Sequence, residues 1–201
     1  MKTTTAESID KKVFILDISE KLFARYGARE TTVRLITQKA GISIAMLNYY
    51  FGSKENLFLT VLERRIQQFK TAKNAVNMDN KGTIEMLLTY MTVYIDLVVD
   101  YQPFYKLMMI EKLLNENKKA VEMIESYFQS NIQTLKNIII QSVDDEKIDG
   151  VNIETFVMNI SGFLAYLILQ TDLTESSLKE EKKQNLKKHI MKVLLASFFE
   201  M

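Results

Sequence analysis

The stretch TVRLITQKAGISIAMLNYYFGSKENL, residues 32–57, decides the fold of this 201-residue chain. Within it, two short segments with apolar residues at helical spacing, 33–40 and 44–51, are separated by a turn that begins with Gly41. A glycine lets the chain reverse tightly, and the small side chain of Ala40 lets the two helices approach closely. This spacing is typical of a helix-turn-helix, in which the outward face of the second helix can enter the major groove of DNA.

Helix-start and helix-stop signals surround this motif. Apolar spacing predicts a first helix over residues 8–26 that ends at Gly27, and Thr32, Ser43 and Ser53 are the predicted N-caps of the next three helices. The predicted buried face of the first helix consists of Ile15, Ile18, Leu22, Phe23 and Tyr26. The predicted inward residues of the later helices are Val33, Ile36, Ala40, Ile42, Leu47, Phe51, Leu57, Phe58, Val61 and Leu62.

The remainder of the chain predicts long helices. With one proline and six glycines there are few breaks, and the helical pattern continues over 83–101, 103–114, 118–143, 153–171 and 178–199, with polar loops at 144–150 and 174–177. We therefore expect an all-α protein. A three-helix helix-turn-helix DNA-binding domain over residues 1–52, with its recognition helix at about 44–51, precedes a larger helical effector-binding and dimerisation domain over residues 53–201.

Composition narrows the possible functions. The chain has no cysteine, which excludes disulfides, cysteine-based zinc sites and thiol chemistry and suits the cytoplasm. The N-terminus lacks the apolar segment of a signal peptide, and the uncharged stretch 155–171 is shorter than a membrane span requires. The one histidine, His189, lies among lysines, and no glycine pattern for phosphate binding occurs. We expect no enzyme activity, no cofactor, no metal and no membrane association.

Charge is distributed unevenly along a chain whose formal net charge is only +1. Residues 1–60 carry nine Lys and Arg against six Asp and Glu, whereas residues 61–201 carry 17 against 19. Since Lys and Arg neutralise phosphates in complexes with nucleic acids, this mild asymmetry favours an N-terminal DNA-binding face.

Residues 15–58 resemble the DNA-binding region of the tetracycline-repressor (TetR) family of regulators. The positions that match the family pattern are Thr32, Ile36, Ala40, Gly41, Ser43, Leu47, Tyr49, Phe51, Ser53, Lys54 and Leu57. The resemblance implies a two-fold homodimer on a double-stranded, pseudo-palindromic DNA operator, usually a repressor, whose C-terminal body binds an effector. It also implies phosphate contacts at the positions of Thr32, Ser43, Tyr49 and Lys54. The chain departs from the family pattern at Leu35, Ile44 and Asn48.

The candidate DNA-binding residues are Thr32, Arg34, Ser43, Ile44, Ala45, Met46, Asn48, Tyr49 and Lys54. Tyr49 and Tyr50 cannot face the same way on a helix, so one of them is exposed, and Tyr49 is the one we place on DNA. An asparagine can read an adenine edge, which makes Asn48 a base-reading candidate, with a neutral surface residue as the alternative. Lys54 and Arg34 are either phosphate contacts or solvated charges.

Aromatic and methionine residues concentrate in the body of the chain. At helical spacing most of them form the core, and a subset can line an effector cavity. The candidates for the cavity are Tyr90, Tyr94, Tyr105, Met109, Phe163 and Tyr166, with Glu111 as a polar group, and their chemistry favours a small apolar or aromatic effector. The predicted dimer surface consists of Phe156, Ile160, Phe163, Leu164, Leu167, Ile168, Leu194, Leu195, Phe198 and Phe199. The alternative function is a helical apolar-ligand carrier or small all-α enzyme without DNA binding.

Overall fold

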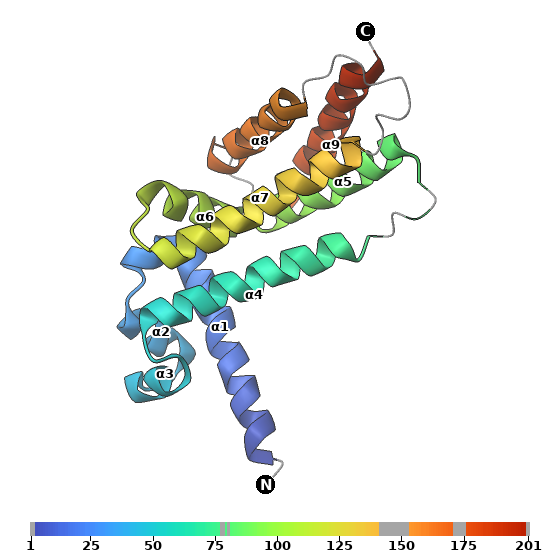
Figure 1. The fold of residues 1–201 in the computed structure, drawn as a ribbon. Coiled ribbons are helices and arrows are strands. Elements are labelled where there is room, and N and C mark those ends of the chain that lie inside the picture. Colours follow the sequence, from blue (N-terminus) through green and yellow to red (C-terminus); the bar gives the residue numbers. More distant parts are fainter. Residues whose placement is uncertain (1–2, 77–78, 80, 141–152, 171–175, 200–201) are drawn as a thin grey trace. The chain divides into compact units, whose positions relative to one another are not determined.

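A computed structural model describes residues 3–76, 79, 81–140, 153–170 and 176–199. These residues form helices and contain no strand (Figure 1). The helices are α1 (Thr3–Glu30), α2 (Val33–Ala40), α3 (Ile44–Phe51), α4 (Lys54–Asn74), α5 (Thr83–Asp100), α6 (Gln102–Leu114), α7 (Lys118–Ile140), α8 (Ile153–Gln170) and α9 (Ser176–Phe199). The all-α prediction is therefore confirmed.

The chain divides into two compact units, which we describe separately. The first contains residues 1–68 and 103–125, and the second contains residues 69–102 and 126–201. The predicted helices of the body agree with the observed ones within a few residues at each end. The predicted loop at 144–150 and the start of the one at 174–177 lie outside the described residues.

In the first unit, α1 is longer than the sequence predicts, beginning at Thr3 and ending at Glu30. The predicted stop at Gly27 is present as an interruption, since Gly27 has φ 84° and leaves the helical region. The Thr31 hydroxyl lies 2.7 Å from the Gly27 carbonyl oxygen and 3.2 Å from that of Leu22, so it completes the hydrogen bonding of the carbonyls at this helix end.

The core of the first unit forms where the apolar faces of α1 and α4 meet. Phe23 and Phe58 pack edge to face with ring centroids 5.0 Å apart, and both are buried. Tyr26 was predicted to join this face, and that prediction is wrong because its side chain is 46% exposed. Tyr26 lies in the turn next to the Gly27 interruption, and its ring packs against the Arg25 guanidinium at 5.3 Å instead.

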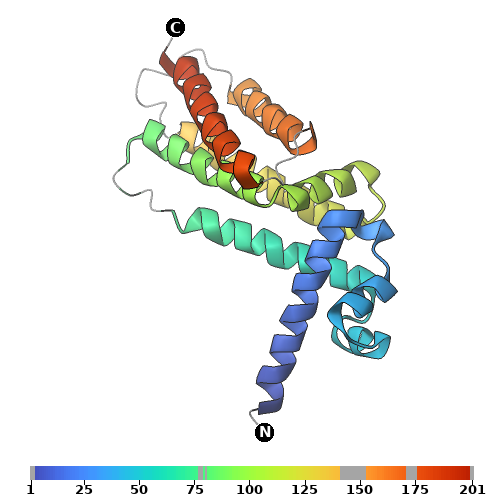
Figure 2. The ribbon, with the colours of Figure 1, turned by 180° about the vertical axis from the view of Figure 1, so that it is seen from behind.

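In the second unit, α5, α7, α8 and α9 share one apolar core; in Figure 2, α5 and α9 lie side by side. The core residues are Leu87, Tyr90, Met91, Ile95, Val99, Leu135, Ile138, Ile139, Val157, Ile160, Leu164 and Ile190. Asp96 of α5 pairs with Lys183 (3.0 Å) and Lys187 (2.6 Å) of α9, which fixes these two helices at their polar edge. No helix among the described residues is long and apolar enough to cross a bilayer.

Candidate nucleic-acid interface

The turn between α2 and α3 is built from residues with defined local roles. The Thr32 hydroxyl accepts the Leu35 amide at 3.1 Å, and the Ser43 hydroxyl accepts the Met46 amide at 3.1 Å, so both helices begin at side-chain caps. Between them, Gly41 adopts φ 64° and ψ 33°, a left-handed conformation that costs other residues energy. The predicted helix-turn-helix is thus present, and the caps and the glycine from which it was predicted do form it.

Helix α3 has one buried face and one exposed face. Leu47 is fully buried and Phe51 is 7% exposed, so this side anchors the helix to the first unit. On the other side Tyr49 is 82% exposed and Ile44 is 52% exposed, and Asn48 is exposed as well. The prediction that Tyr49 rather than Tyr50 is exposed is confirmed, since Tyr50 is half-buried. The exposed face of α3 carries an aromatic hydroxyl and an amide, both of which can hydrogen-bond to DNA.

The N-termini of α2 and α3 add a second element to this surface. Each capping hydroxyl accepts a backbone amide, which leaves its own proton available to a partner such as a phosphate oxygen. Helix N-termini also carry partial positive charge that favours anions. Thr32, Ser43 and Ala45 are exposed, Arg34 is exposed on the first turn of α2, and Met46 is half-buried.

Lys54, the remaining candidate, has a partner inside the chain. Its Nζ donates to the Ala28 carbonyl oxygen at 2.8 Å and to the Arg29 carbonyl oxygen at 3.2 Å. A cation at the C-terminal end of a helix is stabilising, because unpaired carbonyls and the helix dipole make that end negative. The amine therefore caps the end of α1, so a phosphate contact would have to share it with these carbonyls.

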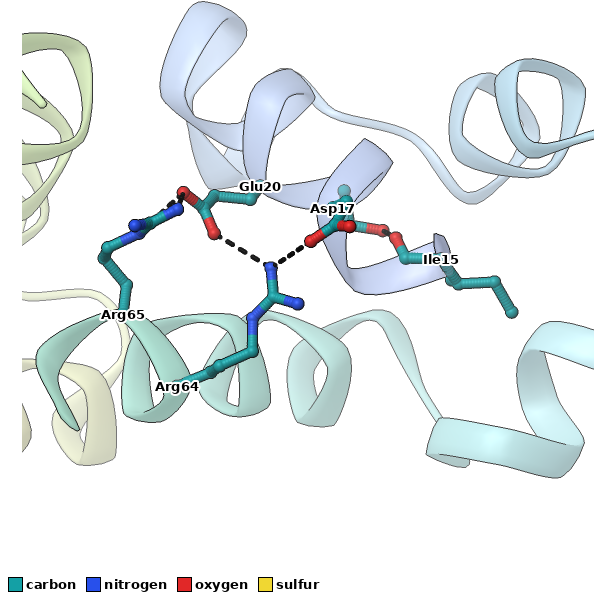
Figure 3. Close-up of polar contacts among 6 residues, drawn as sticks. Ile15, Asp17, Glu20, Arg64 and Arg65 are labelled. Atoms are coloured by element: carbon teal, nitrogen blue, oxygen red, sulfur yellow. Dashed lines mark hydrogen bonds and ion pairs between the residues drawn. The ribbon is translucent and has the colours of Figure 1, made fainter. Parts of the chain in front are cut away.

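An ionic cluster of the same unit, shown in Figure 3, was not predicted from the sequence. Glu20 of α1 accepts from Arg65 Nε at 2.8 Å and from Arg64 Nη2 at 3.1 Å, and it also pairs with Arg65 Nη2. Arg64 Nη2 lies 2.7 Å from Asp17 Oδ1 as well. Glu20 is 8% exposed, so this cluster connects α1 to α4 through a buried carboxylate. No local pattern indicates such contacts, because they join residues more than 40 positions apart.

The candidate effector residues belong to different parts of the chain. Tyr90 is buried and Tyr94 half-buried in the second unit, and their rings are stacked with centroids 6.4 Å apart. Phe163 and Tyr166 of α8 are 37% and 64% exposed. The two remaining candidates, buried Tyr105 and half-buried Met109, lie in α6 within the first unit.

Glu111, the candidate polar group of the predicted effector cavity, lies in the first unit. Its carboxylate receives a hydrogen bond from the backbone of Ala28, and burial raises its pKa above the ordinary value in spite of this bond. A groove of about 520 Å³ does occur between α7 and α8, but its lining includes Gln129, Lys136, Glu154 and Met158 and none of the predicted effector residues.

A polar cluster inside the second unit was also missed by the sequence analysis. Lys73 of α4 is 7% exposed, and its Nζ donates to Asn131 Oδ1 of α7. The ammonium lies 4.5 Å from the ring centroid of Tyr127 and 5.7 Å from that of Tyr94. Burial, followed by the neighbouring charge of Lys70, lowers the pKa of Lys73 to about 8. Among the described residues, no group of three or more His, Asp or Glu side chains is arranged to hold a metal.

Comparison with known proteins identifies the helix-turn-helix. Residues 15–61 match the family model described as "Bacterial regulatory proteins, tetR family". The matched span contains α2, α3 and the buried faces of α1 and α4 that hold them. The N-terminal domain of this chain belongs to the TetR family. The predicted family resemblance is thereby confirmed.

Curated relatives match the TetR-family domain and part of the helical body behind it. The chain is 34% identical over 88 residues to the HTH-type transcriptional repressor KstR2 of Rhodococcus jostii, covering 42% of this chain and 43% of that protein. It is 25% identical over 154 residues to the HTH-type regulator YerO of Bacillus subtilis, covering 76% of this chain and 51% of YerO. The chain thus spans about half the length of the curated relatives it matches.

Solved structures extend the likeness of fold beyond the TetR-family domain. The ketosteroid regulator KstR2 of Mycobacterium tuberculosis has a TM-score of 0.75 at 15% identity, covering 90% of this chain and 92% of that one. The TetR-family regulator PfmR of Thermus thermophilus has a TM-score of 0.73 at 19% identity, covering 89% and 97%. At these identities the likeness shows the fold, an N-terminal helix-turn-helix domain followed by a helical body.

Proposed function

We propose that this chain is a transcriptional regulator that binds a pseudo-palindromic operator as a homodimer and represses until an effector binds. The observation that carries the proposal is α3, whose apolar side is buried in a TetR-family domain while Tyr49 and Asn48 remain exposed. Residues 1–52 supply the DNA-binding domain, and residues 53–201 supply the effector-binding and dimerisation domain. Such a protein acts in the cytoplasm, where the DNA is.

The DNA contacts divide into two kinds. Thr32, Ser43, Tyr49 and Lys54 bind phosphates and set affinity, with Arg34 beside them, whereas base contacts from α3 set sequence preference. Among the exposed residues of α3, Asn48 is the one with a bidentate hydrogen-bonding group, and Ile44, Ala45 and Met46 offer apolar contacts to bases. In the DNA-bound dimer the two copies of α3 lie about 34 to 36 Å apart, one turn of the duplex.

Replacing Asn48 with alanine is expected to weaken operator binding by about 1 to 3 kcal/mol and binding to random duplex much less, because a base contact is lost.

Lys54→Ala should weaken binding to both duplexes equally and reduce the slope of log affinity against log salt by roughly one per lost contact in each half of the dimer, because a phosphate contact is lost. The measurement is a titration of each variant against both duplexes at several salt concentrations.

The matched control is Lys118→Ala, which removes an exposed lysine of the same unit outside the helix-turn-helix and should change neither affinity nor slope. Circular dichroism of Lys54→Ala accompanies the titration, because this variant also loses the cap on α1. If neither Asn48→Ala nor Lys54→Ala changes binding to either duplex, residues 43–54 are not the DNA-reading surface and the proposal fails.

Three residues of the predicted dimer surface are buried within the chain. Ile160, Leu164 and Ile168 were predicted to face a partner, but each is at most 5% exposed, so that prediction is wrong. They pack inward because α8 needs one apolar face for its own unit. The side chains of Phe156, Leu167, Leu194, Leu195, Phe198 and Phe199 lie outside the described residues. The exposed apolar residues are Met158, Phe163 and Tyr166 of α8 and Met191 and Val193 of α9.

We propose that these exposed residues of α8 and α9 pair with their copies in the homodimer. In sedimentation at micromolar concentration the parent should be a dimer, and Tyr166→Glu, which places a charge in the apolar contact, should be a monomer with weakened operator binding. Lys188→Glu, at an exposed position of α9, is the control for the added charge. A parent protein that sediments as a monomer and still binds operator would contradict this surface.

A further inference from the structure

Lys73 is a buried cation that the proposed function does not use. Its ammonium makes one hydrogen bond, to Asn131 Oδ1, and faces the rings of Tyr94 and Tyr127. Within the described part of the chain no carboxylate pairs with it, and the nearby charge that contributes to its environment is the like charge of Lys70. A buried ammonium without an anionic partner costs stability. A negatively charged ligand that paired with the Lys73 ammonium would therefore stabilise the folded protein.

Asn131, which binds the ammonium, and Tyr90, whose ring stacks on that of Tyr94, also carry buried polar atoms. Because Asn131 Oδ1 accepts from the ammonium, its Nδ2 is left as the donor, and this buried Nδ2 interacts with the Tyr94 hydroxyl but makes no hydrogen bond of good geometry among the described residues. The buried hydroxyl of Tyr90 interacts with the Thr134 side chain but likewise makes no hydrogen bond of good geometry among the described residues. Native proteins rarely leave such groups unpaired, and each one calls for an explanation. The ammonium and these two polar groups could therefore each donate to a better acceptor within the second unit.

Tyr94 of α5 lies beside this cluster, with its ring centroid 5.7 Å from the Lys73 ammonium. Burial is the largest cause that raises the pKa of its hydroxyl, and a hydrogen bond with Asn131 acts in the opposite direction. Its side chain nevertheless keeps accessible surface and is only half-buried. Half-buried apolar side chains of the same core, Leu88 and Ile132, lie on α5 and α7, and Ile132 also lines the groove between α7 and α8.

We propose that Lys73, Asn131 and Tyr90 bind the carboxylate head group of an amphipathic acid whose apolar body packs among the side chains of α5 and α7. This assignment rests on the proposed ligand-responsive function and names the chemical class of its effector. A carboxylate matches the site in charge, since one ammonium balances one negative charge, and in hydrogen bonding, since its two oxygens accept from several donors. A phosphate monoester would bring about twice the charge to a single lysine.

The test measures ligand binding directly, in the absence of DNA. Octanoate and benzoate are the acidic probes, with octanol and benzyl alcohol as neutral counterparts of similar size, titrated at pH 7 by calorimetry against the full-length protein. At least one acid should bind the parent more tightly than its neutral counterpart. Lys73→Met should lose at least tenfold in affinity for that acid and leave the neutral compound unaffected, whereas Lys70→Met should keep the parent's preference.

Asn131→Asp is a second variant that does not depend on removing the lysine. It places a carboxylate next to the ammonium from within the chain, so it should abolish acid binding while the protein stays folded. If neither acid binds the parent, or if Lys73→Met and Asn131→Asp bind the acid as well as the parent does, the assignment is overturned. DNA binding is measured separately, so loss of the acid site and failure of operator binding are distinguishable. An acid that binds at Lys73 without changing operator affinity supports the site and contradicts the ligand response.

Discussion

Replacing Glu20 with alanine is expected to lower the free energy of unfolding by about 3 kcal/mol, the largest effect we expect from a single substitution in the first unit. Glu20 is the buried carboxylate that Arg64 and Arg65 share, and both guanidinium groups are largely covered. Without it, the neighbouring guanidinium groups of Arg64 and Arg65 lose the buried carboxylate that they share, and Asp17, which pairs with Arg64, is 54% exposed. Removing one partner of a buried ion pair is costly, because the desolvated charges that remain lose their compensation.

Asp17→Ala is the control, because it removes the other carboxylate of the same cluster. Asp17 is 54% exposed, so solvent screens its pairing with Arg64, and we expect a loss of less than about 1 kcal/mol. Urea unfolding of the two variants and the parent, followed by circular dichroism, gives both numbers. Equal losses for Glu20→Ala and Asp17→Ala would show that burial does not set the strength of this cluster.

Lys73 should make stability depend on pH in the alkaline range. Its pKa is about 8 in the folded chain and 10.5 when exposed. Below pH 8 both states carry the proton and stability has no slope from this group. Between pH 8 and 10.5 the unfolded chain holds a proton that the folded chain has released, so raising the pH favours the folded state. The gain reaches about 2.5 kcal/mol by about pH 10, at roughly 1.4 kcal/mol per pKa unit.

The measurement compares the parent with Lys73→Met, because other lysines and tyrosines also titrate in this range and cancel in the difference. The stability of the parent relative to Lys73→Met should rise from pH 7.5 to pH 10. Lys70→Met keeps Lys73 and should retain the rise. A difference between parent and Lys73→Met that stays constant with pH would mean that the ammonium keeps its proton in the folded chain, and with it a partner that compensates for burial.

The parts that sequence predicted well are those that depend on neighbouring residues. Caps at Thr32 and Ser43 and the glycine turn at Gly41 act over three or four positions, so they can be read locally. Periodicity also assigned Leu47 and Phe51 to the buried face of α3. These local signals were enough to locate the helix-turn-helix and its exposed face.

The parts that sequence missed depend on which helices meet. Periodicity shows that α8 has apolar positions, but it cannot tell that Ile160 and Leu164 pack within the chain while Tyr166 stays exposed. Similarly, nothing near Lys73 in the sequence indicates that Asn131, 58 positions away, accepts its hydrogen bond.

The cap that Lys54 places on α1 has a consequence for local opening. Lys54 and Ala28 are 26 positions apart, and the segment between them contains α2, the turn and α3. The hydrogen bond therefore closes that segment into a loop, because it links Ala28, near the end of α1, to the first residue of α4. Local unfolding that starts at either end of the segment must first break this hydrogen bond. We therefore expect the backbone amides of α2 and α3 to become accessible to solvent together, as one cooperative unit, rather than one helix at a time.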